Sequence, residues 1–342
     1  MRVAMYYNNR DIRLEELPVP RIGPGEALVK ITASGICGSD VMEWYRLPRA
    51  PRVLGHEIAG EIVEVGHGVT RYKVGDRVSA SHHVPCNTCY YCLNGHHTVC
   101  DTLRTTSFDP GGFSQYVRLP AINVDRGVYP LPDGVSDEEA TFIEPLACVL
   151  RGQQQAGFRP GQSVLVMGSG ITGILHINLA RALGARRIVA TDITGYRLRA
   201  ARRFGADEAI HAKDDVPDRL RKANGGMLAD VVIVCTGALP AIEQSFRCVE
   251  RGGTILLFAP TEPGASVPFF INHVLWGNDV SITTTYAGSP ADHITVLELI
   301  RSRRVRVRDM ITHRLGLAET GLGFQLVEKA QDSLKVIIEP QR

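Results

Sequence analysis

Hydrophobic positions in roughly the first 150 residues fall in short runs of Val, Ile, Leu and Ala that are separated by Gly and Pro. Runs of this kind are typical of strands, and Gly and Pro between them are typical of the connecting turns. The pattern predicts strands at residues 27–31, 58–65, 77–79 and 116–119. We therefore expect a β-rich barrel or sandwich with long loops in this part of the chain.

The pattern changes near residue 151, where short apolar runs begin to alternate with segments of helical spacing. It predicts strands at residues 163–167, 187–191, 231–234 and 254–258. Helices are predicted between them, at residues 172–183, 197–204 and 241–248. Such alternation favours a doubly wound, parallel α/β sheet. A helix over residues 293–301 and a strand over residues 334–338 are predicted to follow.

A glycine-rich turn joins the first of these strands to its helix, with the sequence Gly168-Ser169-Gly170-Ile171-Thr172-Gly173. In a dinucleotide-binding turn, the first glycine bends the chain, the second lets a pyrophosphate approach, and the third lets helix and sheet pack closely. Asp192 ends the next strand, about 20 residues further on, where a carboxylate binds adenosine ribose hydroxyls and disfavours a 2′-phosphate. The turn therefore predicts NAD rather than NADP. A glycine turn without a nucleotide is the alternative.

Length and composition narrow the class of protein. A chain of 342 residues is longer than one hydrophobic core usually supports, so more than one domain is expected. Its content of 44% hydrophobic and 22% charged residues excludes a disordered or fibrous protein. The net charge of +2 is too balanced for an electrostatic nucleic-acid binder. We interpret the arginine cluster at residues 301–308 as a solvated helix end or strand edge, with a polyanion site as the alternative.

Neither a secretory signal nor a membrane span is predicted. The first 11 residues hold no apolar segment of the kind that a secretory signal has. The stretch at residues 162–180 lacks charged side chains, but it contains the glycine turn and is better explained as a buried strand, loop and helix. We expect a cytoplasmic protein without a membrane partner.

Four cysteines lie close together in a C-x2-C-x2-C-x7-C pattern, at Cys86, Cys89, Cys92 and Cys100. In a reducing compartment, this spacing indicates a metal site rather than disulfides. Four thiolates close a tetrahedron around Zn²⁺ and leave no position for a substrate, so this zinc would be structural. Free surface thiols or a redox pair are the alternatives, although a redox pair does not account for the third and fourth cysteines.

A second possible zinc site is dispersed along the chain at Cys37, His56 and Glu144. One thiolate, one imidazole and one carboxylate would leave a fourth position open, as in a catalytic zinc site. Taken singly, the cysteine could be a buried apolar residue and the glutamate could end a strand. Spacing alone does not bring the three together.

Taken together, these motifs resemble the zinc-dependent medium-chain dehydrogenase family, especially its sorbitol- and threonine-dehydrogenase-like branch, over essentially the whole chain. The most specific stretch is Gly55-His56-Glu57-Ile58-Ala59-Gly60. The resemblance implies a GroES-like catalytic domain at residues 1–148 and 287–342, with a structural-zinc loop at about residues 82–102. A Rossmann NAD-binding domain at residues 149–286 would interrupt it, with the active site between the two. It also implies two zinc ions per chain and a homo-oligomer, a dimer or a tetramer.

The resemblance also assigns roles near the catalytic zinc. Cys37, His56 and Glu144 would be its ligands, and Glu57 would lie in or just behind the ligand set. Ser39 would be the first proton acceptor, able only to pass the proton on. Asp40 would orient His56 through the other ring nitrogen.

Two further roles concern the cofactor, and one position departs from the family. Arg197 would pack near the adenosine and Thr236 would line the cofactor cleft, although each could be an ordinary surface or loop residue. Many relatives have a histidine at the position of Met42, which closes their proton relay. Glu57, bound water or a cofactor ribose hydroxyl are the alternative routes by which a proton could leave.

The implied reaction is hydride transfer from a secondary alcohol to NAD⁺, assisted by zinc acting as a Lewis acid. A polyol, sugar or cyclitol is the expected small-molecule substrate, and a threonine or amino-alcohol substrate is the alternative. A non-catalytic NAD(H)-binding sensor or assembly protein, or a zinc-free quinone reductase, would be of a different class. The complete set of candidate zinc ligands argues against both.

Overall fold

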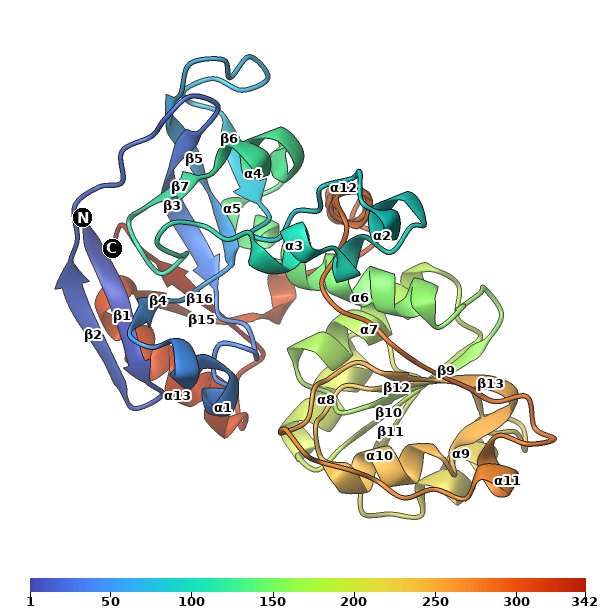
Figure 1. The fold of residues 1–342 in the computed structure, drawn as a ribbon. Coiled ribbons are helices and arrows are strands. Elements are labelled where there is room, and N and C mark those ends of the chain that lie inside the picture. The colour runs from blue at the N-terminus through green and yellow to red at the C-terminus, as the bar shows by residue number, and fades with distance from the viewer. The chain divides into compact units, whose positions relative to one another are not determined.

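The computed structural model describes residues 1–342, apart from the side chain of His273. The chain forms two compact units, and the second interrupts the first in sequence (Figure 1). The first consists of Met1–Ala147 and Ala287–Arg342, and the second of Cys148–Tyr286.

The first unit contains a seven-stranded sheet in the order β15-β16-β3-β5-β6-β8, with β7 beside β3, and a three-stranded sheet in the order β2-β1-β4. All pairings are antiparallel except that of β15 with β16. The strands are β1 (Arg2–Asn8), β2 (Asp11–Glu16), β3 (Ala27–Gly35), β4 (Arg52–Val53), β5 (Glu57–Val65), β6 (Arg77–Ala80), β7 (Tyr116–Leu119), β8 (Val128–Pro130), β15 (Ile311–Gly316) and β16 (Lys335–Glu339).

Short helices connect these strands. They are α1 (Glu43–Arg46), α2 (Tyr90–Leu93), α3 (Asp101–Thr105), α4 (Ala121–Arg126), α5 (Asp137–Ala140), α12 (Pro290–Arg301) and α13 (Thr320–Lys329), with α6 (Ile143–Gln155) beginning in this unit. Single 3₁₀ turns lie at Leu47–Arg49, His97–Val99, Arg308–Met310 and Leu317–Glu319.

The core of the first unit follows the two-residue period of its strands. On β3, Ala27, Val29 and Ile31 are buried against Ile58 and Ile62 of β5. A second cluster joins the ends of the chain, because Val336 and Ile338 of β16 pack with Val3 and Tyr6 of β1. The C-terminal strand therefore shares a core with the first strand of the chain, although the two strands belong to different sheets.

The second unit is a six-stranded, wholly parallel sheet in the order β11-β10-β9-β12-β13-β14. Its strands are β9 (Ser163–Met167), β10 (Arg187–Asp192), β11 (Glu208–His211), β12 (Ala229–Val234), β13 (Val249–Leu257) and β14 (Ser281–Thr284). The helices are α7 (Ile171–Ala182), α8 (Gly195–Arg203), α9 (Val216–Ala223), α10 (Leu239–Ser245) and α11 (Ile271–Val274).

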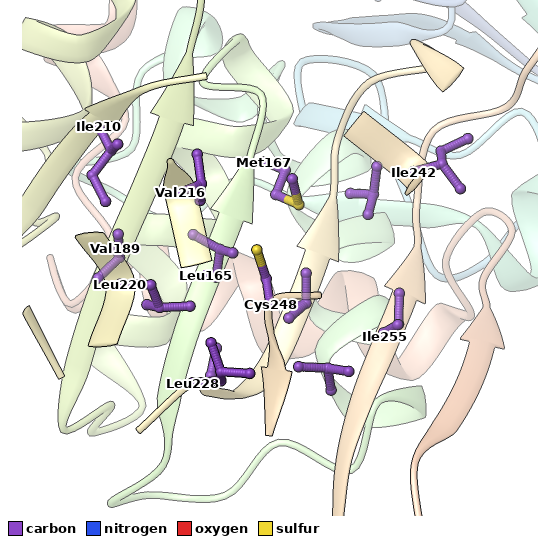
Figure 2. Packing of buried hydrophobic residues seen from close by; sticks show 14 residues of the cluster. Leu165, Met167, Val189, Ile210, Val216, Leu220, Leu228, Ile242, Cys248 and Ile255 are labelled. Carbon is purple, nitrogen blue, oxygen red and sulfur yellow. The ribbon is translucent and has the colours of Figure 1, made fainter. Parts of the chain in front are cut away.

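The core of this sheet is mainly aliphatic where it meets its helices, with Met167 and Cys248 as its sulfur-containing members. Leu165 and Val189 on the sheet belong to the same buried cluster as Val216 and Leu220 of α9, and Ile242 of α10 joins them (Figure 2). Strands buried in this way read as continuous apolar runs, which is why their positions could be predicted.

The predicted fold class is confirmed: a GroES-like β-rich part and a Rossmann-type parallel sheet are both present. The strand over residues 116–119 and the strand over residues 163–167 have the predicted bounds. The charge-free stretch at residues 162–180 forms β9, the glycine turn and most of α7. In the part of the chain that the structure describes, no helix is long and apolar enough to cross a membrane.

The arginine cluster has the predicted character of a helix end. Helix α12 ends at Arg301, which pairs with Glu298 one turn earlier. Arg303 turns back to bind the buried Glu139 and the carbonyl of Gly134.

Candidate active site

Cys37 lies in a tight turn just after β3, and hydrogen bonds fix its sulfur. The backbone N–H of Ile36 bonds Val336 on β16, at 3.0 Å, so the turn is anchored to the sheet. Both the backbone N–H and the hydroxyl of Ser39 donate to Cys37 Sγ at 3.4 Å. These two bonds hold the sulfur in a fixed position, as a metal ligand requires.

His56 stands at the start of β5, and its place depends on the glycine before it. Gly55 has φ of +91°, and a Cβ there would come within 2.8 Å of the backbone nitrogen of Phe113. His56 Nδ1 lies 3.4 Å from Asp40 Oδ1, and this carboxylate is fully buried. Because Asp40 holds Nδ1, the other ring nitrogen is left for a metal, as predicted.

The ligand atoms of Cys37, His56 and Glu57 all lie within 4.8 Å of one another. The turn after β3 and the start of β5 meet because Gly35 and Glu57 are paired residues of the two strands. Glu144, in the first turn of α6, is nearly buried but is not a member of this group. The structure thus brings together Cys37, His56 and Glu57, and Glu144 as a ligand stays a prediction.

Glu57 has a buried partner that the sequence did not reveal. The ammonium of Lys335, on β16, forms an ion pair with Glu57 Oε2, and both side chains are excluded from solvent. Lys335 reaches across β3 at Gly35, where a Cβ would collide with both partners. The available signal was a lysine at the head of an otherwise apolar terminal strand, because buried lysines are rare without a paired charge.

The charges around His56 favour a cation at this point. Burial lowers the pKa of His56, but the nearby Asp40 and Cys37 outweigh it and leave that pKa well above the ordinary range. Burial would raise the pKa of Asp40, yet His56 and Arg46 hold it below its usual value. The cluster of Cys37, His56 and Glu57 therefore favours a positive charge. With one sulfur and one carboxylate among its ligand atoms, it fits a divalent ion such as Zn²⁺.

Arg46 of α1 is a second residue that sequence reasoning missed. Its Nε donates to the carbonyl of Ser39 and its Nη2 to the Ser39 hydroxyl, both at 2.9 Å. Nη2 also lies 3.3 Å from Asp40 Oδ1. Nearby, Met42 precedes α1, and the carboxylate of Glu43 accepts a bond from the backbone N–H of Asn9 at 3.1 Å. Glu43 is therefore directed to Asn9.

The four-cysteine loop forms the second compact sulfur group, with all four Sγ atoms within 4.8 Å of one another. Cys86 Sγ accepts bonds from the N–H groups of Thr88 and Cys89, at 3.4 and 3.2 Å. These bonds lower the pKa of Cys86 to about 5. Asn87 between them has φ of +63°, in the left-handed region. Four converging sulfurs with N–H donors fit a closed tetrahedral zinc site.

The glycine turn has the geometry expected for a nucleotide. Gly168 has φ of +94°, and a Cβ on Gly173 would collide with the carbonyl oxygen of Gly168. The backbone N–H groups of Ser169 and Thr194 both donate to the Asp192 carboxylate at 2.9 Å. Asp192 thereby joins the glycine turn to the start of α8.

The remaining cofactor residues also gather at this turn. Arg197 Nη1 lies 3.9 Å from Asp192 Oδ2, and its guanidinium borders Gly170. Thr236, just after β12, lies against Gly168. All of these residues belong to the carboxyl ends of β9, β10 and β12 or to the helices that follow, where such sheets bind ligands.

Two family descriptions match the chain: "Alcohol dehydrogenase GroES-like domain" over residues 23–133 and "Zinc-binding dehydrogenase" over residues 172–302. The sorbitol dehydrogenase of Gallus gallus is 31% identical over 340 residues, covering 96% of this chain and 93% of that protein. The sorbitol dehydrogenase of Bacillus subtilis is 31% identical over 356 residues, covering 100% and 98%.

Among solved structures, the alcohol dehydrogenase of Thermus sp. ATN1 superimposes with a TM-score of 0.88 at 28% identity, covering 99% of each chain. The fold and the two sulfur-containing sites thus define a zinc-dependent oxidoreductase that uses a nicotinamide cofactor. The chain belongs to the zinc-dependent medium-chain dehydrogenase family, as its sequence predicted.

Proposed function

We propose that this enzyme oxidises a secondary alcohol of the polyol, sugar or cyclitol class to the ketone, and catalyses the reverse reduction, with NAD(H). The observation that carries the proposal is the convergence of Cys37, His56 and Glu57 in a unit whose relatives include two sorbitol dehydrogenases. Bound at these residues, zinc supplies Lewis-acid polarisation of the substrate hydroxyl, and NAD⁺ accepts the hydride.

The residues around that site bind, orient and transfer protons. Asp40 fixes the ring of His56, and Arg46 fixes both Asp40 and the Ser39 hydroxyl. Ser39 Oγ lies beside Cys37 Sγ, so its hydroxyl is placed next to the atoms that would surround the reacting oxygen. Because Arg46 only donates, Ser39 can take the alcohol proton only while passing its own onward.

We assign the catalytic zinc to Cys37, His56 and a carboxylate, and a structural zinc to Cys86, Cys89, Cys92 and Cys100. Of the two candidate carboxylates, we favour Glu144 as the ligand of the loaded enzyme. The charge of Glu57 is already compensated by Lys335, so binding zinc through Glu57 would compete with a buried ion pair. Glu57 then acts from just behind the ligand set.

We assign the cofactor as NAD, bound by residues 168–173, Asp192, Arg197 and Thr236. The support is the carboxylate of Asp192, which would repel a 2′-phosphate at the ribose. Asp192 accepts three hydrogen bonds, from the N–H groups of Ser169 and Thr194 and from the Thr194 hydroxyl, which leaves acceptor capacity for one ribose hydroxyl.

We further propose a cytoplasmic homo-oligomer, a dimer or tetramer, that pairs through β14. This strand is at the edge of the parallel sheet, bonded to β13 on one side. Ile282 within it and Tyr286 just after it are exposed. An exposed edge with apolar side chains is suited to pairing with a second copy. The eight free cysteines are in keeping with a reducing compartment.

The test is NAD⁺ reduction by the purified enzyme with a panel of polyols, inositols and amino alcohols, before and after treatment with a chelator. We expect turnover with at least one polyhydroxy substrate, loss of turnover on chelation and recovery with Zn²⁺. Turnover of amino alcohols alone would assign the threonine-type reaction. A protein that binds zinc and NAD but oxidises nothing in the panel would be a sensor, and the proposal would be wrong.

A further inference from the structure

Arg52 is a partly buried cation without a counter-ion. It belongs to β4, where its backbone pairs with Tyr6 of β1, so its position is fixed by the sheet. Among the described residues, its guanidinium has neither an ion pair nor a hydrogen bond, whereas the neighbouring Arg46 is paired with Asp40. Burial, and then repulsion by Arg46 and Arg49, lower the pKa of Arg52. A cation in this situation favours a bound anion.

Arg52 lines a small cavity next to the candidate catalytic site. The cavity has a volume of about 40 Å³, and its walls include Arg52, Arg46, His56, His82 and Asp40, whose carboxylate is already paired with Arg46 and His56. A cavity of this size has room for a small polar group. His56 belongs both to this cavity and to the candidate zinc ligands.

A second unsatisfied group is found in the same cavity. His82 Nδ1 is buried and has no hydrogen-bond partner, while the His82 ring packs against His56 with 4.8 Å between ring centroids. Buried polar atoms nearly always have a partner, so this nitrogen, on a residue of the cavity wall, has hydrogen-bonding capacity that the protein itself does not use. Arg52 and His82 therefore offer a charged donor and a ring nitrogen to the same small group.

We infer that this cavity binds a carboxylate of the substrate, which makes the substrate a polyhydroxy acid rather than a neutral polyol. The inference rests on the proposed dehydrogenase activity and names its substrate class. Arg52 binds the carboxylate, which supplies its missing counter-charge. His56 borders both the cavity and the candidate zinc site, so the carboxylate would bind beside the site at which the hydroxyl reacts.

The test compares matched acids and alditols with the zinc-loaded enzyme. D-Gluconate and D-sorbitol differ at one terminal carbon, as do D-galactonate and galactitol. We expect a kcat/KM at least tenfold higher for an acid than for its alditol, and an acid KM that rises with ionic strength because charge attraction is screened. Isothermal titration of D-gluconate into the enzyme with NADH gives a readout that does not depend on turnover.

Three substitutions at two positions locate the effect. Arg52→Gln should raise the KM for the acid, and weaken its calorimetric binding, at least tenfold, with the alditol KM changed less than twofold. Arg49→Gln removes the same charge from an exposed neighbour outside the cavity wall and should change neither. Arg52→Lys, which keeps the charge, should retain most of the preference, and thermal melting checks that each variant is folded.

The outcomes separate the two proposals. If alditols are oxidised as well as the acids and Arg52→Gln affects both equally, the inference is wrong and the dehydrogenase function stands. If no alcohol is oxidised, the dehydrogenase function fails. In that case, gluconate binding that Arg52→Gln abolishes would still support an anion site, and no binding would overturn it.

Discussion

Lys335, on the last strand of the chain, reaches across Gly35 to pair with Glu57, which lies 278 positions earlier in the sequence. Neither side chain is accessible to solvent, so neither charge can be compensated by water. The pair joins β16 to β5 across β3 and holds the carboxylate beside Cys37 and His56. The C-terminal segment therefore contributes directly to the electrostatics of the candidate active site.

Removing Lys335 should destabilise the enzyme strongly. Lys335→Met leaves the Glu57 carboxylate buried without a partner, and breaking a buried pair in this way costs about 3–5 kcal/mol. We expect a fall of that size in the free energy of unfolding, measured with urea. The double variant Lys335→Met/Glu57→Gln should recover much of the loss because no charge is left unpaired. A single variant within about 1 kcal/mol of the parent would show that the pair is not a buried pair in solution.

The two proposed zinc sites should be separable by substitution. Cys37→Ser should reduce the zinc content from about two ions per chain to about one and abolish turnover, with little change in melting temperature. Cys100→Ser should also remove about one zinc but should lower the melting temperature. Elemental analysis and thermal melting measure both effects. Cys248→Ser, in the aliphatic core of the second unit, is the control and should keep both ions. Retention of both ions in Cys37→Ser would contradict the assignment.

Asp192 should set the choice between NAD and NADP. Asp192→Ser removes the charge that would repel a 2′-phosphate and one acceptor for the ribose. We expect the ratio of kcat/KM for NAD⁺ to that for NADP⁺ to fall at least tenfold, which is about 1.4 kcal/mol of discrimination. The exposed Asp214 pairs with Arg219 outside the glycine turn, so Asp214→Ser should leave the ratio unchanged. An unchanged ratio in Asp192→Ser would remove the basis for assigning NAD.

Stability should decline in acid because His176 is buried as a neutral imidazole. Burial in α7 lowers the pKa of His176 to about 3, and its ring packs edge-on against Phe258. Below the unfolded value of about 6.5, the unfolded chain binds a proton that the folded chain does not. The free energy of unfolding should therefore fall by about 1.4 kcal/mol per pH unit from this residue, between about pH 6.5 and 3.

Substitution isolates that contribution. His176→Asn should reduce the slope of stability against pH by about 1.4 kcal/mol per unit between pH 6 and 4. The same change at the exposed His67 is the control and should leave the slope as it was. Denaturant titrations at a series of pH values give both slopes. Equal slopes for the parent and His176→Asn would mean that the imidazole is protonated in the folded state.

A charge on the edge strand should disrupt assembly. Ile282→Lys places an ammonium on β14, where lysine opposes strand pairing between copies. Light scattering after size exclusion should show a shift toward monomer. Leu322→Lys, on the exposed face of α13 in the other unit, should leave the mass unchanged. An Ile282→Lys protein with the mass of the parent would place the interface elsewhere.

The sequence predicted those parts of the fold whose pattern is local. Strand β9 is a buried, mostly apolar run and β7 alternates buried Val117 and Leu119 with more exposed residues, so the bounds of both could be read directly. Strands β1 and β2 were missed because Arg2–Glu16 carries many charged residues and β2 is partly exposed along its length. Pairing with distant strands, rather than an apolar pattern of its own, makes this segment β.

The residues of the candidate site could be predicted from the sequence, but several of the contacts between them could not. Cys37, Asp40 and His56 are together as expected, because β3 and β5 are neighbours. Periodicity gave no sign of Lys335 or Arg52, since a charge within a short strand is ordinarily at its exposed edge. Which glutamate approaches Cys37 and His56 depends on the path of α6, and spacing along the chain does not encode it.

The loop of four cysteines has almost no hydrocarbon interior of its own. Its small buried cluster contains Leu103 and the sulfurs, with Ala287 packed beside them. On the proposed zinc occupancy, metal–sulfur bonds take the place that aliphatic packing has elsewhere in the molecule. If zinc is scarce, we therefore expect the four-cysteine loop to become accessible to proteases first. The parallel sheet, with its mainly aliphatic interior, would stay folded. The rate of proteolytic cleavage within residues 86–100 would then report how much zinc is available to this loop.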